Sequence, residues 1–486
     1  MSFSSLGFFV LLLGCAAVYY AVPARRQPAV LLAASLVFYA CSSVGYLALL
    51  AAAVVFAWAM ARAVARAGAG TGGRKGLLAA ALVVLAANLC FFKYYDWFGR
   101  QLAQFAFRND WPFIPPDYGL AAPLGVSFYT FALMGYLIDV YRGKISPVST
   151  PWNLGLFAAF FPLVSSGPIE RAGRLLPQLK APHAFDYEGF CQGASRMLWG
   201  FFKKFVVADT IGITVGRVYG APADFTGPYL ALATLLYAYQ LYSDFSGYSD
   251  IAIGAARIFG VQAAENFSRP FWAGSYQGLW NRWHNSLTGW FREYLYFPLG
   301  GSRKGAARTY LNILIIFLVS GIWHGSTVNF AVWGLLNGVY MALARARGKW
   351  RPLPQKRGTV RYLWGVVCCF VLFASAIVFF RAETLADALT VYTRLTAGWG
   401  QALADPAGVV ATLKGLNIGR VTGLLILGGT AACEWVEWRA ARAGVTTGAW
   451  MRSLRAPVRL ALYYALALAV MMYGQMGQSA FIYFQF

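Results

Sequence analysis

The sequence predicts an all-α protein that crosses a membrane many times. Of its 486 residues, 59% are hydrophobic and only 12% are charged, whereas a soluble domain carries about a quarter charged residues. Several apolar runs approach or exceed the roughly 20 residues that cross a bilayer as a helix. The net charge of +23 is typical of a protein whose basic cytosolic loops contact anionic lipid head groups. A nucleic-acid partner is not expected, because no basic soluble region is present to bind one.

The apolar runs are the candidate spans, and some are short enough to be tilted or re-entrant. The first is expected to be a retained helix and not a cleaved signal peptide, because the opening MSFSSLGFF lacks the Lys or Arg of such a signal. The runs are 6–22, 29–41, 44–61, 76–95, 119–141, 229–260, 309–323, 327–344, 362–380, 421–433 and 457–476.

Charged loops alternate along the first part of the chain and predict its orientation. The N-terminal residues are uncharged, and the first run is followed by Arg25 and Arg26. This alternation places the N-terminus outside and the Arg25–Arg26 loop in the cytosol. Two further basic clusters could dock an acidic partner molecule. They are Arg171, Arg174 and Lys180, and Arg303, Lys304 and Arg308.

No soluble domain can be separated from the chain, so a single domain over residues 1–486 is expected. Residues 1–118 and 346–486 are plain spans, whereas 119–345 hold many polar and aromatic residues at apparent membrane depth. Seven scattered cysteines without a CxxC pair argue against disulfides or a zinc site. Three distant histidines without an HExxH motif leave no metal site, and no phosphate-binding loop indicates an ATP pump.

Broken backbone is expected at 158–170, whose sequence is AAFFPLVSSGPIE. Pro162 and Pro168 flank two serines and a glycine there, which a straight helix does not accommodate. Irregular backbone at membrane depth is tolerated where protein buries it or where it lines a wet cavity, and we expect this segment to line a cavity. A kinked helix without a further role is the alternative.

Two carboxylates lie within the apolar run 237–260. Asp244 and Asp250 are rare at membrane depth, where a carboxylate is a functional candidate by default. In a helix they fall on different faces, so they do not form an acid–base pair. The alternative is that each satisfies neighbouring helices or caps a break near Gly247.

A tryptophan-rich segment follows at 265–305. Trp and Tyr favour the membrane–water interface, and a helix beginning at Ser275 would align Trp283, Leu287, Trp290 and Tyr294. This pattern predicts an amphipathic helix at the interface. His284 lies on this segment, and an inert, half-wet histidine is the simplest interpretation from the residues alone.

His324 lies inside the run LVSGIWHGSTVNFAVWGLLNGVY, at 318–340. Desolvation favours the uncharged imidazole there, which is the form that accepts a proton from a hydroxyl. A histidine that only bonds a neighbouring helix is the alternative. Ser320, Asn329 or a freed backbone N–H could stabilise an oxyanion beside such a base.

Three motifs in order carry a resemblance to a known family. They are YSDFSGYSDIAIG at 242–254, WNRWHNSLTGWFREYLYFPLGG at 280–301 and LVSGIWHGSTVNFAVWGLLNG at 318–338. With the C-terminal FIYFQF, they resemble the membrane-bound O-acyltransferase family. The likeness is strongest to the branch typified by the membrane subunit of bacterial alginate O-acetylation, which is related to the D-alanyl transfer protein of teichoic acid modification.

The resemblance implies about eleven transmembrane helices, with re-entrant or interfacial helices, around a central funnel or tunnel. It implies that His324 is the catalytic histidine and that His284 is the second functional position at the tunnel mouth. The expected substrate-tunnel candidates are Asp244, Asp250, Trp283, Asn285, Trp323 and Asn329.

The same resemblance implies the reaction and its setting. A multi-pass protein of the bacterial inner membrane would move an acyl group from a cytosolic thioester, acetyl-CoA or an acyl carrier, to an extracytoplasmic polysaccharide such as alginate. Periplasmic acetyltransferase or esterase-like proteins are the expected partners, and no cofactor is expected to stay bound. The alternatives are a transporter or flippase, which would explain broken helices, and a non-catalytic scaffold of a polysaccharide-modification complex.

Overall fold

The computed structural model describes residues 3–68, 72–112, 116, 119, 122–350, 358–475 and 481–482, and no strand occurs among them. The predicted all-α fold is therefore confirmed. The chain divides into two compact units. The first comprises Met1–Gly193 and Ala255–Ala264, and the second comprises Ala194–Gly254 and Glu265–Phe486. The single domain expected over residues 1–486 stays a prediction beside this division.

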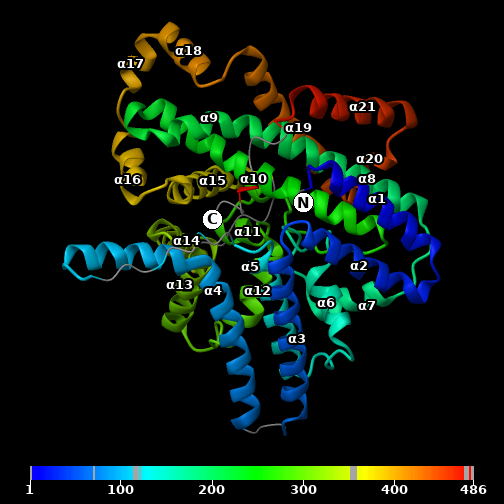
Figure 1. Cartoon of the computed structure of the whole chain (residues 1–486). Coiled ribbons are helices and arrows are strands. Elements are labelled where there is room, and N and C mark those ends of the chain that lie inside the picture. The colour runs from blue at the N-terminus through cyan, green and yellow to red at the C-terminus, as the bar shows by residue number, and fades with distance from the viewer. Residues whose placement is uncertain are drawn as a thin grey trace. The chain divides into compact units, whose positions relative to one another are not determined.

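The first unit consists of the N-terminal helices. Ser5 and Ser43 begin two of them, because each side chain accepts a backbone N–H from the first helical turn. Figure 1 shows α3 and α4 side by side, with α4 bending along its length. The helices are α1 (Leu6–Ala21), α2 (Gln27–Ala40), α3 (Val44–Arg66), α4 (Gly72–Arg108), α5 (Val126–Tyr141), α6 (Pro151–Ala159), α7 (Ala172–Lys180) and the first half of α8 (Tyr187–Phe201).

The predicted break in 158–170 is confirmed. Helix α6 ends at Ala159, and turns follow as far as Gly167. Gly125 packs against this break with φ 65°, and a Cβ there would lie 2.0 Å from the Val164 carbonyl oxygen. The cavity beside the break has a volume of about 30 Å³, far below the several hundred Å³ of a small-molecule site. The segment therefore does not line a cavity of substrate size there, contrary to expectation, and protein burial accounts for its irregular backbone.

The second unit holds the rest of the chain. Its π-helical segments are η2 (Phe202–Ala208) and η5 (Arg292–Tyr296), and its 3-10 segments are η3 (Pro222–Asp224) and η4 (Pro270–Trp272). Besides the second half of α8 and α10 (Gly227–Ile258) as far as Gly254, its helices are α9 (Asp209–Gly220), α11 (Tyr276–Trp280), α12 (Asn285–Phe291), α13 (Ala306–His324), α14 (Val328–Trp350), α15 (Val360–Arg381), α16 (Leu385–Arg394), α17 (Trp399–Ala404), α18 (Pro406–Gly415), α19 (Arg420–Ala443), α20 (Thr447–Ser453) and α21 (Ala456–Tyr473).

Glycines bring α13 and α14 into close contact as an antiparallel hairpin. A Cβ on Gly321 would lie 2.2 Å from the Phe330 carbonyl oxygen, and one on Gly334 would lie 2.3 Å from that of Phe317. Small residues allow this approach between membrane helices, where dispersion contacts replace the hydrophobic effect. The hairpin fixes the end of α13, where His324 lies.

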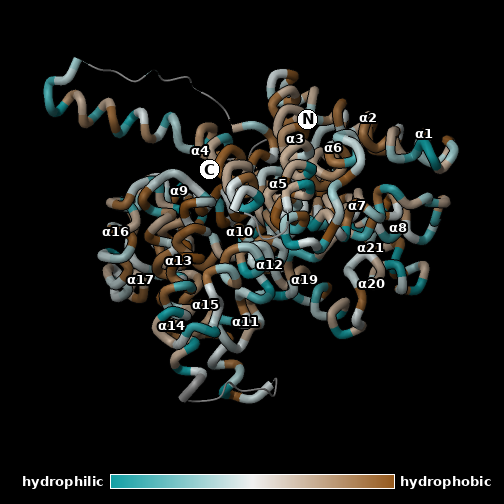
Figure 2. The backbone as a smooth tube through the Cα atoms, turned by 90° about the horizontal axis from the view of Figure 1, so that it is seen from below, coloured by the Kyte–Doolittle hydropathy of each residue, from teal (hydrophilic) through white to brown (hydrophobic). Residues whose placement is uncertain are grey.

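Five described helices are long and apolar enough to cross a membrane, or six if the bent pair α18 and α19 is one span. The five are α3, α4, α13, α15 and α21. The count of about eleven is not confirmed, because α1, α2 and α5 have 14 to 16 residues and because α10 carries buried charges. Figure 2 shows apolar residues predominating around α13 and α15.

The orientation can be tested with a natural cysteine. Cys41 is exposed in the turn between α2 and α3, which the charge alternation places outside. With the other six cysteines replaced, we expect a membrane-impermeant maleimide to label Cys41 from the extracytoplasmic side. A Gly68→Cys variant lacking Cys41 should be labelled only after the membrane is permeabilised, because residue 68 follows α3 and is expected in the cytosol. Labelling of Cys41 from the cytosolic side alone would reverse the orientation.

Candidate active site

The second unit contains a cavity of about 210 Å³ that is lined by both His284 and His324. The structure thus brings together two histidines that are forty positions apart in the sequence. Most of the lining is apolar or aromatic, with a few hydroxyl, amide and guanidinium groups. Its other lining residues are Gln277, Trp280, Asn281, Trp283, Leu287, Thr288, Phe291, Arg292, Tyr296, Ile313, Ile316, Phe317, Ser320, Met341 and Arg345.

His324 is the last residue of α13 and is 6% exposed. Three aromatic rings surround its imidazole edge-on, with centroid distances of 4.8 Å to Trp323, 5.1 Å to Trp333 and 5.3 Å to Phe380. A Cβ on Gly325 would clash with the Phe330 ring at 2.0 Å, so only glycine fits directly after the histidine. The ring is therefore held in an apolar setting that disfavours its charged form.

His284 lies at a sharp break between α11 and α12, with φ 45° and ψ 55°. The single amphipathic helix predicted from Ser275 is therefore wrong, although Trp283 and Leu287 are buried as that pattern required. The interpretation of His284 as half-exposed to water is also wrong. The residue is 2% exposed, and its ring packs edge-on against Phe245 with a centroid distance of 4.6 Å. Burial lowers the pKa of His284 to about 3, so its ring is neutral at pH 7.

Of the other tunnel candidates, Trp283 lines the cavity and Trp323 contacts both histidines, with its ring centroid 6.3 Å from that of His284. Asn329 donates a side-chain hydrogen bond to the Ala382 carbonyl oxygen at 2.8 Å. Asn285 donates its backbone N–H to the carbonyl oxygen of Asn266. Neither of these two asparagines lines the cavity among the described residues.

Two arginines lie at the opposite end of the cavity from His324. Arg345 belongs to the last part of α14, and Arg292 begins the π-helical segment η5. The cavity follows α13 from Ile313 to His324, which at 1.5 Å per helical residue is about 16 Å. One end of the cavity is therefore cationic, and the other holds the imidazole of His324.

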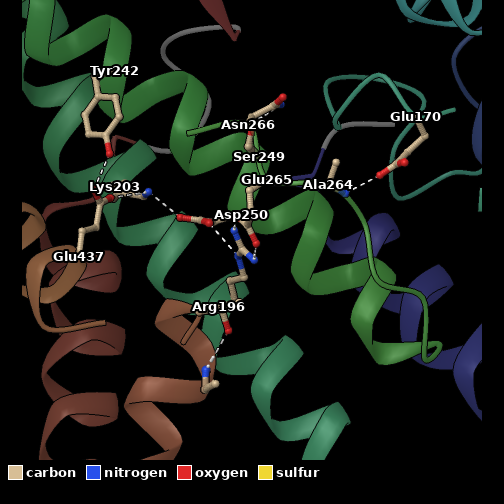
Figure 3. A network of polar contacts seen from close by, with 12 residues as sticks. Glu170, Arg196, Lys203, Tyr242, Ser249, Asp250, Ala264, Glu265, Asn266 and Glu437 are labelled. Atoms are coloured by element: carbon tan, nitrogen blue, oxygen red, sulfur yellow. Dashed lines mark hydrogen bonds and ion pairs between the residues drawn. The ribbon is translucent and has the colours of Figure 1, made fainter. Parts of the chain in front are cut away.

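The two carboxylates of α10, Asp244 and Asp250, do not line this cavity, and each is paired with buried cations. Asp250 bonds Arg196 at 2.8 Å and Lys203 at 2.5 Å, and Lys203 also contacts Glu437 at 3.1 Å. Figure 3 shows the chain of contacts, which continues from Arg196 to Glu265. We call these five residues the ion network.

Asp244 forms a separate buried cluster on another face of α10. It contacts Lys204 at 2.5 Å, and the same ammonium group bonds Asp209 at 2.8 Å. Helix α10 runs unbroken through Gly247, so the carboxylates do not cap a break there, and the alternative that each satisfies neighbouring elements agrees with the ion pairs. A Cβ on Gly247 would lie 2.8 Å from the Gly200 carbonyl oxygen, and this close approach places both lysines against the carboxylates.

The sequence indicated both histidines but did not indicate the roles of the cations in the second unit. Lys203 and Lys204 stand between apolar residues in MLWGFFKKFVVAD, a context that predicts buried ammonium groups needing counter-ions. Arg345 carries no such signal, because a basic residue near a helix end is common. Among the described residues no cluster of His, Cys, Asp and Glu could hold a metal ion. The catalytic roles of the candidates and the absence of a bound cofactor stay predictions.

Comparison with known sequences identifies the family. The sequence profile of the membrane-bound O-acyltransferase family matches residues 35–380, a range that includes both histidines and every other residue that lines the cavity. The chain belongs to the membrane-bound O-acyltransferase family. It is a multi-pass membrane protein and an O-acyltransferase, so the transporter and scaffold alternatives are set aside.

Individual relatives agree with this assignment. The chain is 35% identical over 398 residues to "Probable alginate O-acetylase AlgI" of Pseudomonas putida, covering 81% of this chain and 79% of the relative. It is 31% identical over 387 residues to the peptidoglycan O-acetyltransferase of Helicobacter pylori, covering 74% and 72%. It is 29% identical over 284 residues to the teichoic acid D-alanyltransferase of Bacillus subtilis, covering 54% and 71%. The resemblance read from the three motifs is confirmed.

The ion network predicts that Asp250 is structural. We expect Asp250→Asn to destabilise the detergent-solubilised protein by about 3 kcal/mol, because Arg196 and Lys203 would remain buried with less compensating charge. The measurement is thermal unfolding followed by size-exclusion chromatography. Asp186→Asn is the control, because Asp186 is an exposed partner of Arg257 at 3.3 Å and should cost less than about 1 kcal/mol. Unchanged stability with lost activity would instead make Asp250 catalytic.

Proposed function

We propose that the enzyme moves an acetyl or other short acyl group from a cytosolic thioester to a hydroxyl of an extracytoplasmic polysaccharide, with His324 as the general base. The observation that carries this proposal is the single cavity between the two histidines and the two arginines. The relatives named for alginate and peptidoglycan O-acetylation support a polysaccharide as the acceptor class.

Charge supports entry of the donor from the cytosol. The hairpin of α13 and α14 is antiparallel, so Arg308 near its start and Arg345 near its end belong to the same side of the membrane. The positive-inside rule makes that side cytosolic. Phosphate groups of acetyl-CoA or of an acyl carrier suit Arg292 and Arg345, since guanidinium groups bind phosphate oxygens well. The thioester would then reach His324 through the apolar length of the cavity.

The chemistry requires one base and one oxyanion donor. As the acceptor oxygen attacks the thioester carbonyl carbon, His324 takes the hydroxyl proton, and the carbonyl oxygen becomes an oxyanion. Collapse of this tetrahedral intermediate breaks the carbon–sulfur bond, and the imidazolium of His324 gives its proton to the departing thiolate. Ser320 lines the cavity one turn before His324 and is the favoured oxyanion donor. Among the described residues no cysteine lines the cavity, so direct transfer is favoured over an acyl-enzyme carried on a thiol.

The setting follows from the same proposal. A cytosolic donor and an extracytoplasmic polymer require a protein in the bacterial inner membrane, with about eleven crossings if α1, α2, α5, α10 and α14 also lie in the bilayer. Periplasmic acetyltransferase or esterase-like proteins would carry the acyl group on to polymer chains that do not reach the cavity. No cofactor needs to remain bound, because both substrates supply the reacting groups.

Substitution of the histidines tests the proposal. We expect His324→Ala and His324→Gln to lower transfer by about 10³–10⁴-fold, the upper part of the range for a lost general base. The measurement is O-acetylation of surface glycan in cells with matched amounts of protein. His284→Ala should also reduce transfer, but less. The third histidine, His183, belongs to the first unit, and His183→Gln is the control at matched folded protein. Substantial acetylation by His324→Gln would mean that His324 only positions a substrate.

The cationic end of the cavity gives an independent prediction. We expect Arg345→Ala to raise KM for the thioester donor roughly 10- to 100-fold with little change in kcat, because a charged hydrogen bond made equally in the ground and transition states is lost. The control is Arg347→Ala, which removes the same charge from an exposed position two residues away. Equal effects of both variants would indicate only a general basic surface, without a donor contact at Arg345.

A further inference from the structure

His284 adopts a backbone conformation that its own element does not stabilise. Its φ of 45° is in the left-handed region, which non-glycine residues rarely occupy. As the residue before α12 it makes no side-chain capping bond to the helix. The first N–H groups of a helix need partners from outside, so another segment must both satisfy α12 and hold the turn.

That segment is Glu265–Ser268, which we call the strap. Two backbone hydrogen bonds join it to the turn on either side of His284. The Asn285 N–H donates to the Asn266 carbonyl oxygen at 2.8 Å, and the Ser268 N–H donates to the Arg282 carbonyl oxygen at 3.1 Å. The strap therefore supplies the partner that the start of α12 lacks, and it spans the left-handed residue.

The side chain of Asn266 adds the bonds that link the strap to both neighbouring helices. Its Oδ1 accepts a hydrogen bond from Ser286 Oγ at 2.7 Å, and its Nδ2 donates to Ser249 Oγ at 3.0 Å. Asn266 is 1% exposed, so these bonds are made away from water. The Asn266 amide thus accepts through its oxygen and donates through its nitrogen, from two separate atoms of one planar group.

The strap is itself anchored by charge and by aromatic packing. Glu265 forms a two-pronged pair with Arg196, with distances of 2.6 and 2.5 Å, and Figure 3 shows this pair beside the contact of Asn266 with Ser249. Phe267 meets Trp283 edge-on at 5.2 Å. The ion network therefore reaches the turn of His284 through a continuous set of contacts.

We propose that Asn266 is a positioning residue that fixes the imidazole of His284 in the cavity, and that the Arg196–Glu265 pair holds Asn266 for this purpose. The proposal rests on the proposed function, in which the cavity lined by His284 and His324 is where the acyl group is transferred. It also gives the ion network a role in the reaction without contact with substrate.

The first test follows the histidine itself and does not depend on activity. The chain has only three histidines, so ¹⁵N-histidine labelling of the full chain in nanodiscs gives a spectrum that single His→Gln variants assign. Asn266→Ala should shift or broaden the signal of His284 and leave that of His183 unchanged. Asn312→Ala is the matched control, because Asn312 is also buried and joins α13 to the carbonyls of Leu299 and Gly301. If the His284 signal is unchanged in Asn266→Ala, the proposal is wrong.

The second test connects position to rate. Misplacement of a catalytic group on the order of 1 Å can cost about 10²-fold, so Asn266→Ala should lower kcat roughly 10- to 100-fold per folded molecule, and Ser286→Ala should lower it less. In a protein that already carries His284→Ala, adding Asn266→Ala should not lower kcat any further. If Asn266 had a purely structural role, the two substitutions would instead lower the rate additively, in free-energy terms. If Asn266→Ala shifts the His284 signal but leaves kcat unchanged, Asn266 does position His284, and the proposed function is contradicted.

Discussion

Charge buried inside the protein is the constraint on which the second unit depends. Arg196 and Lys203 would be costly to bury alone, and Asp250 and Glu437 compensate them in one connected network. Because removal of any member leaves an uncompensated charge, the helices that carry them are held in one arrangement. The network ends at Glu265, next to the strap that shapes the turn of His284. Stability and the geometry of the site therefore share the same contacts.

The sequence predicted the helices well, because apolar periodicity and helix length follow directly from membrane thickness. The runs 309–323 and 362–380, for example, correspond to α13 and α15 within three residues at each end. The number of crossings could not be predicted in the same way, since α10 is long enough to span but contains buried ion pairs. The amphipathic helix from Ser275 failed because the strap, which lies earlier in the chain, imposes a left-handed turn that periodicity does not reveal.

The site was predictable in part. His324 and His284 were identified from local context and family motifs, and the structure places both on one cavity. Arg345 and Asn266 were not, because their significance arises from what they meet across the fold. Asp250 was expected to line the tunnel, but in the structure its carboxylate pairs with Arg196 and Lys203. Isolated polar residues in apolar runs therefore predict burial reliably, whereas their role depends on the partners that folding brings.

The most direct test of the account is a cryo-electron microscopy structure of the full chain with a non-transferable thioether analogue of acetyl-CoA. The account predicts density for the ligand arm running from Arg292 and Arg345 along α13, with the acyl carbonyl group within about 4 Å of the His324 ring, close to the reach of a general base. Binding of the analogue outside this cavity, or histidines that face separate spaces, would contradict it.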